Sequence, residues 1–131
     1  MQPFYKFLLP FMLAIDVAVC CGQRPSPVSW ICRAAPATSH ATTISITAVI
    51  PRGWHLYSQS IKAGGPTPTS ITFEPNDDYI LQGITVEKGE AVRYYHKAVE
   101  MEITRYSGTV TFSQGVMLIR SGVTIKATSP T

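Results

Sequence analysis

The feature that most constrains the fold is an alternation of apolar and polar side chains with a period of two residues. It recurs from residue 28 onwards in short stretches that are separated by Gly, Pro, Asn and Asp. A period of two is that of a β-strand, whose successive side chains point to opposite faces of a sheet. Beyond residue 22 we find no run of apolar residues at helical spacing. The alternation therefore predicts an all-β chain.

The expected strands cover residues 28–32, 42–50, 54–58, 70–74, 79–86, 98–106, 109–120 and 122–127. The stretch 42–50 is rich in β-branched Thr, Ile and Val, which fit a pleated sheet. Turns or breaks are expected at 51–53, 75–78, 88–90 and 107–108, where Gly, Pro, Asn and Asp gather. About eight short strands with frequent turns predict an antiparallel β-sandwich.

The amino terminus has the three-part pattern of a secretory signal. Lys6 supplies a charged start, residues 7–15 an apolar centre, and small residues follow as far as Gly22. The apolar centre is shorter than the about 20 residues that a membrane span needs. We therefore expect a secreted or periplasmic protein.

This interpretation divides the chain into a signal at 1–22, a tether at 23–27 and one β domain at 28–131. Two alternatives stay open. Cys20 is a candidate lipidation site, in which case the protein is a surface lipoprotein held by a lipid anchor. The other alternative is a cytosolic protein with a buried amino-terminal helix.

Cysteine content and charge exclude several classes of protein. Removal of the signal leaves Cys32 as a lone thiol, which excludes an internal disulfide framework. The sequence has no Cys-x-x-Cys spacing, and the two histidines His55 and His96 do not by themselves make a credible metal site. No metal and no cofactor are therefore expected. The net charge is only +3 and the Lys and Arg residues are scattered, so nucleic acid is not an expected partner.

Two motifs stand close together, Gly-Trp-His-Leu-Tyr-Ser-Gln at 53–59 and Gly-Gly-Pro at 64–66. Further pieces follow the same order along the chain, at 27–30, 68–70, 73–75, 106–108 and 110–114, with Tyr79, Leu81 and Gly83 between them. Together they resemble the amino-terminal domain of the bacterial DsbD-type thiol–disulfide interchange reductases, in the form common in Bacteroidota-type bacteria. The resemblance extends from residue 27 to about residue 127.

The resemblance implies an immunoglobulin-like sandwich in the periplasm. Such a domain takes electrons from a membrane-embedded electron-transfer domain and passes them to periplasmic thiol–disulfide proteins. In the family, the reacting cysteine pair sits on the last hairpin, after a strand that corresponds to residues 123–127. The sequence reaches Thr131 without that pair. We therefore expect a C-terminally incomplete domain that is redox-inactive by itself, and an exposed edge strand through which copies self-associate.

The family also has an aromatic cap loop that shields its cysteines. By that resemblance Tyr57, Tyr94, Tyr95 and His96 are candidate cap or partner-contact residues, although they also fit ordinary aromatics at a strand edge. Cys32 fits a small buried hydrophobe, and a single thiol cannot resolve a mixed disulfide. A stand-alone secreted binding module therefore remains the second hypothesis for the function.

Overall fold

The structure, a computed structural model, describes residues 15–21, 27–35, 40–120 and 123–129, and every element in these ranges is a β-strand. The all-β prediction is confirmed. The strands are β1 (Ile15–Cys21), β2 (Ser29–Ala34), β3 (Ala41–Val49), β4 (Leu56–Tyr57), β5 (Thr72–Phe73), β6 (Tyr79–His96), β7 (Met101–Leu118) and β8 (Val123–Ser129).

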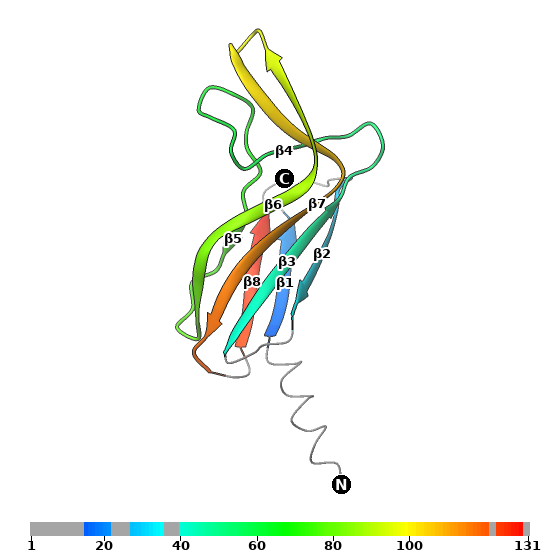
Figure 1. The fold of residues 1–131 in the computed structure, drawn as a ribbon. Helices are drawn as coiled ribbons and strands as arrows, with labels where there is room; N and C mark the ends of the chain where they lie inside the picture. The colour runs from blue at the N-terminus through cyan, green and yellow to red at the C-terminus, as the bar shows by residue number, and fades with distance from the viewer. Residues whose placement is uncertain (1–14, 22–26, 36–39, 121–122, 130–131) are drawn as a thin grey trace.

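The strands form two sheets (Figure 1). The smaller sheet has the order β1-β8-β5, and the larger has the order β2-β3-β7-β4 with β6 also paired to β7. Residues 109–117 of β7 pair with β3, and most of them pair with β6 as well, so β3 and β6 flank β7 on opposite sides. All strand pairs are antiparallel, as expected, except β1 with β8, which is parallel.

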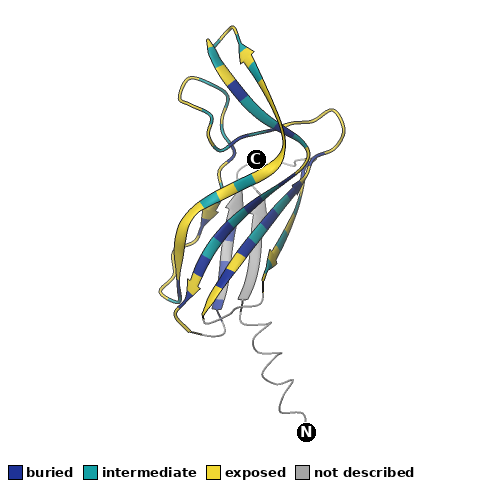
Figure 2. Ribbon diagram, viewed as in Figure 1, coloured by how far each residue is buried: buried dark blue, intermediate teal, exposed yellow. Residues whose placement is uncertain are grey.

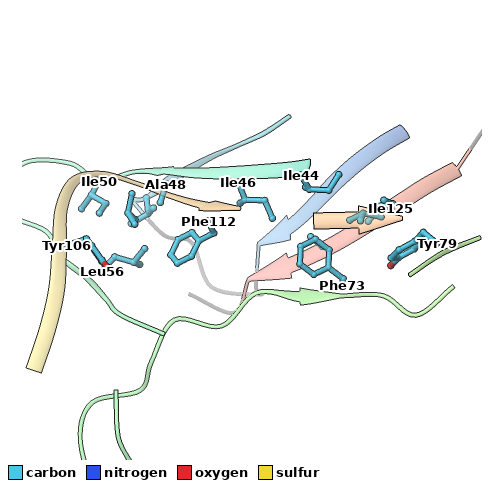
Figure 3. Packing of buried hydrophobic residues seen from close by; sticks show 14 of the residues in the cluster. Ile44, Ile46, Ala48, Ile50, Leu56, Phe73, Tyr79, Tyr106, Phe112 and Ile125 are labelled. Carbon is cyan, nitrogen blue, oxygen red and sulfur yellow. The ribbon is translucent and has the colours of Figure 1, made fainter. Parts of the chain in front are cut away.

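One hydrophobic core lies between the sheets (Figure 3). In β3 the alternation places Ile44, Ile46 and Ala48 on the buried face, where they meet Phe112 from β7. The smaller sheet contributes Ile125 and its neighbours on β8. Burial of a side chain of this size stabilises the fold by about 1.5–3 kcal/mol, so the shared core holds the two sheets together.

The expected turn at 88–90 and the expected break at 107–108 are wrong. Strands β6 and β7 continue through them, and each is 18 residues long. The glycines there serve a β-bulge, at which the register shifts between Gly89 and Glu90. A Cβ at Gly89 would lie 2.7 Å from the Thr109 carbonyl oxygen, and Gly108 has φ of 74°. Glycine is needed for close approach and for a positive φ, not for a chain reversal.

The far half of the β6–β7 hairpin, residues 90–107, extends beyond the sheets as an arm (Figure 1). Its two strands pair with each other, and only the short β4 joins them, through Tyr106 and Arg105. The loop expected around Tyr94 and Tyr95 is therefore strand. The chain reverses at residues 97–100, where the Glu100 amide donates to the Lys97 carbonyl oxygen at 3.3 Å.

Only part of the predicted signal, 1–22, falls within the described residues. Its stretch 15–21 is β1, which runs parallel to β8 from Ile15 opposite Val123 to Cys21 opposite Ser129. Residues 1–14 and most of the tether lie outside the described ranges, and the signal remains a prediction. Among the elements that the structure describes, no helix is long and apolar enough to cross a membrane.

Candidate functional site

A partly buried carboxylate joins the loop after β4 to the middle of β6. Glu87 Oε1 accepts a hydrogen bond from the Gln59 backbone N–H at 2.9 Å. Glu87 Oε2 accepts from the Tyr106 hydroxyl at 2.6 Å and also from the Ser58 hydroxyl. The Ser58 Oγ in turn accepts from the Ser60 amide at 3.0 Å. The end of the 53–59 motif is thus fixed onto Glu87, at the base of the arm.

These contacts determine the protonation states of Glu87 and Tyr106. Burial alone raises the pKa of Glu87, but the hydrogen bonds from Ser58, Tyr106 and Gln59 outweigh it, and the pKa lies below its ordinary value. Burial, the hydrogen bond to Glu87 and the charge of that carboxylate raise the pKa of Tyr106 to about 12. At neutral pH the carboxylate is ionised and the phenol is protonated. Such a pair anchors a loop and does not exchange protons near neutral pH.

An open groove of about 670 Å³ lies beside this carboxylate, within the usual size range of ligand sites. Its floor is the buried Gln114 side chain, whose Nε2 donates to the Gln82 carbonyl oxygen at 3.0 Å and whose Oε1 accepts from the Thr85 hydroxyl at 2.7 Å. Its wall carries Ile84, 82% exposed, and Val86. The groove therefore has an apolar wall, and the polar atoms of the Gln114 side chain at its floor already have hydrogen-bond partners within the protein.

Three of the four predicted aromatic residues gather on one face of the arm. The Arg105 guanidinium carbon lies 4.7 Å from the centroid of the Tyr94 ring, and the Tyr94 and His96 rings are 6.1 Å apart and tilted. Tyr57 on β4 is directly opposite Arg105 on β7. Within the described residues, His96 Nδ1 and Arg105 Nε are buried without a hydrogen-bond partner. The contacts described for this cluster are therefore a cation over an aromatic ring and a pair of tilted rings.

The fourth predicted residue, Tyr95, points away from this cluster. It follows Tyr94 in a strand, so its side chain lies on the opposite face of the arm, and it is 61% exposed. The Gly64-Gly65 loop covers the cluster's own face. A Cβ at Gly65 would lie 2.9 Å from Met101 Sδ and 3.4 Å from Ile103 Cδ1. This contact shows how closely the second motif packs on the arm.

The remaining sequence candidates lie elsewhere. Cys32 on β2 is opposite Ile46, half-buried and packed against the core. Cys20 on β1 pairs in register with Thr128, far along the chain from the arm. His55 lines a smaller pocket of about 180 Å³. Across the part of the chain that the structure describes, no three His, Cys, Asp or Glu side chains are grouped so that they could hold a metal ion.

No pattern in the sequence indicates Glu87, Tyr106 or Arg105 as functional residues. Glu87 lies 29 residues after Ser58 and 19 before Tyr106, so no local spacing connects them. The available signal was indirect, because Ser58, Gln59 and Tyr106 all belong to the segments that carry the family resemblance. Their common partner becomes visible only with the register of the β6–β7 hairpin.

Comparison of the chain with protein-family models, with curated proteins and with solved structures finds no match.

Proposed function

We propose that this chain is a secreted or periplasmic protein-binding module with an immunoglobulin-like sandwich, of the type found at the amino terminus of DsbD-type thiol–disulfide interchange reductases. Its partner in this proposal is a periplasmic thiol–disulfide protein or a membrane electron-transfer domain. The module contacts the partner through the arm and does not itself reduce disulfides.

One observation carries the proposal: both motifs of the resemblance converge on the arm. The 53–59 motif ends on Glu87 and Tyr106, through the bonds of Ser58 and Gln59. The Gly64-Gly65 motif packs on Met101 and Ile103. Residues whose side chains only filled the core would not need to meet at a projecting hairpin. The convergence supports a role in which the shape of the arm matters.

The chemistry of the thiols supports binding without turnover. Thiol–disulfide exchange needs an attacking thiolate and a second cysteine that resolves the mixed disulfide. Cys32 is half-buried on β2 against the core and is not part of the arm. Cys32 therefore acts in this proposal as a packing residue.

The second candidate function is a stand-alone binding module for a partner outside thiol–disulfide exchange. The observation that favours it is the apolar groove beside Ile84 and Val86, which lies outside the predicted aromatic set. In this alternative the partner fills the groove, and substitutions at the tip of the arm leave its binding unchanged.

The experiment that tests the first proposal uses the full chain and a periplasmic thioredoxin-fold oxidoreductase whose resolving cysteine is replaced. Binding is measured by isothermal titration calorimetry, and turnover by the reduction of insulin disulfides with a chemical electron donor. We expect binding without turnover, binding weakened at least tenfold by Tyr95→Ala, and no effect of Cys32→Ser.

The matched control is Ile31→Ala, which removes an exposed apolar side chain from β2, away from the arm. It should leave the affinity unchanged. Turnover that disappears in Cys32→Ser would contradict the redox-inactive assignment. Absence of binding to the oxidoreductase would reject the family assignment and leave the groove-binding alternative.

A further inference from the structure

Strand β6 forms an unusually long open edge. Within the described residues it pairs only with β7, whereas β7 is paired on both sides. No other described strand pairs with the outer edge of β6, which is exposed over most of its length (Figure 2), and the Gln59 side chain donates to the Thr85 carbonyl oxygen at 3.3 Å. Unpaired strand edges accept further strands unless they are blocked. Self-association was expected at the end of the chain, but there β8 is flanked by β1 and β5, and the long open edge is β6.

Exposed apolar side chains are concentrated on this strand. Six of the eleven large apolar residues that are exposed in the described ranges belong to β6. They are Ile80, Leu81, Ile84, Val86, Val92 and Tyr95. An edge that carries so much apolar surface gains by covering it, because burial removes that surface from water.

The sequence of β6 indicates which register a second copy would adopt. Two identical antiparallel strands related by a two-fold axis place one residue opposite itself. An axis at Glu87, Lys88 or Glu90 sets two like charges directly against each other, which is unfavourable. An axis at Gly89 avoids this, because the residue on the axis has no side chain.

The register with Gly89 on the axis is also complementary on both sides of it. Lys88 of each copy then lies opposite Glu90 of the other, so that two opposite-charge pairs form. Val86 likewise lies opposite Val92, twice. All four side chains are exposed in the single chain and free to make these contacts.

We infer that two copies of this chain dimerise through β6, antiparallel, with Gly89 on the two-fold axis. The dimer joins the two larger sheets into one continuous sheet. It goes beyond the proposed partner binding, since it needs no other protein.

The test is a charge-reversal cycle on the full chain, with the dimer dissociation constant measured by sedimentation equilibrium over a range of concentrations. K88E places two acidic pairs across the axis, and E90K places two basic pairs there. Each should weaken the dimer at least tenfold. The double variant K88E/E90K restores both opposite-charge pairs and should return the constant to within about threefold of the original.

The matched control is K62E, which changes the net charge as K88E does but on an exposed loop residue outside β6. It should leave the dissociation constant unchanged, and circular dichroism establishes that each variant is folded. A chain that stays monomeric up to millimolar concentration overturns the proposal. A dimer whose dissociation constant is unchanged by K88E and by E90K also overturns it. So does a dimer that both single variants weaken and that the double variant K88E/E90K does not restore.

Discussion

The bond between Tyr106 and Glu87 allows a quantitative prediction. Tyr106→Phe removes the hydroxyl and keeps the buried ring, so the core loses no packing volume. A hydrogen bond to a charged acceptor contributes about 1.5–3 kcal/mol. Glu87 is only partly buried and keeps its bonds from Ser58 and Gln59, which places the cost at the lower end. We expect the free energy of unfolding to fall by about 1.5 kcal/mol.

The assay is unfolding in guanidinium chloride at pH 7, followed by the fluorescence of Trp30, whose ring lies 6.2 Å from that of Phe112 in the core. A double-mutant cycle with Glu87→Gln should show a coupling energy of about 1 kcal/mol. Tyr79→Phe is the matched control, because the buried Tyr79 hydroxyl donates to the neutral Glu74 carbonyl oxygen. It should show no coupling to Glu87→Gln.

The same pair predicts a dependence on pH. The pKa of Tyr106 is raised to about 12 in the folded protein. Its contribution to the free energy of unfolding is therefore complete below the unfolded pKa of about 10 and is lost as the pH rises towards 12. Because the pKa of Glu87 is lowered, its stabilisation is present above the unfolded pKa of about 4.3 and is lost as the pH falls below it. The cost of Tyr106→Phe should therefore shrink at both extremes. A cost below about 0.3 kcal/mol at pH 7, or one that stays constant from pH 3 to pH 12, would refute the reasoning.

Three further predictions concern stability. Phe112→Ala, at a side chain 1% exposed, should cost about 3–5 kcal/mol in chemical unfolding, and a cost below 1 kcal/mol would mean that the core is not packed as described. Gly89→Ala should cost about 1–3 kcal/mol, because its Cβ would meet the Thr109 backbone; a thermal melt unchanged by the substitution would exclude that approach. Arg120→Ala breaks an exposed ion pair of 2.7 Å with Asp78 and should change stability by less than about 0.5 kcal/mol, so a larger loss in calorimetry would contradict a surface role.

The strands were predictable wherever alternation and β-branched residues agree. Residues 42–50 were expected as a strand and β3 covers Ala41–Val49, because Ile44, Ile46 and Ala48 all need the same buried face. Gly89 was misread, because glycine serves a turn and a bulge equally well. Only the approach to the Thr109 carbonyl oxygen distinguishes the two.

The candidate site was predictable in part. The resemblance directed attention to Tyr57, Tyr94 and His96, which do gather around the arm, and the alternation of side chains along β6 explains why Tyr95 does not. Glu87 could not be found in this way. Its role depends on a loop and two long strands meeting in one register, and periodicity along the chain does not determine that register.

The length of β7 has a mechanical consequence. One continuous strand forms part of the arm at Met101–Tyr106 and part of the core at Val110–Leu118, so the arm joins the core through the β-bulge at Gly89 and Gly108 and not through a loop. The arm is clamped at its base, where Tyr106 and Ser58 bind Glu87, and the Gly64-Gly65 loop also packs on it at Met101, beside the turn at its tip. Bending of the arm should therefore also displace the Gly64-Gly65 loop. A force applied at the tip would load the hydrogen bonds between β7 and β3 directly.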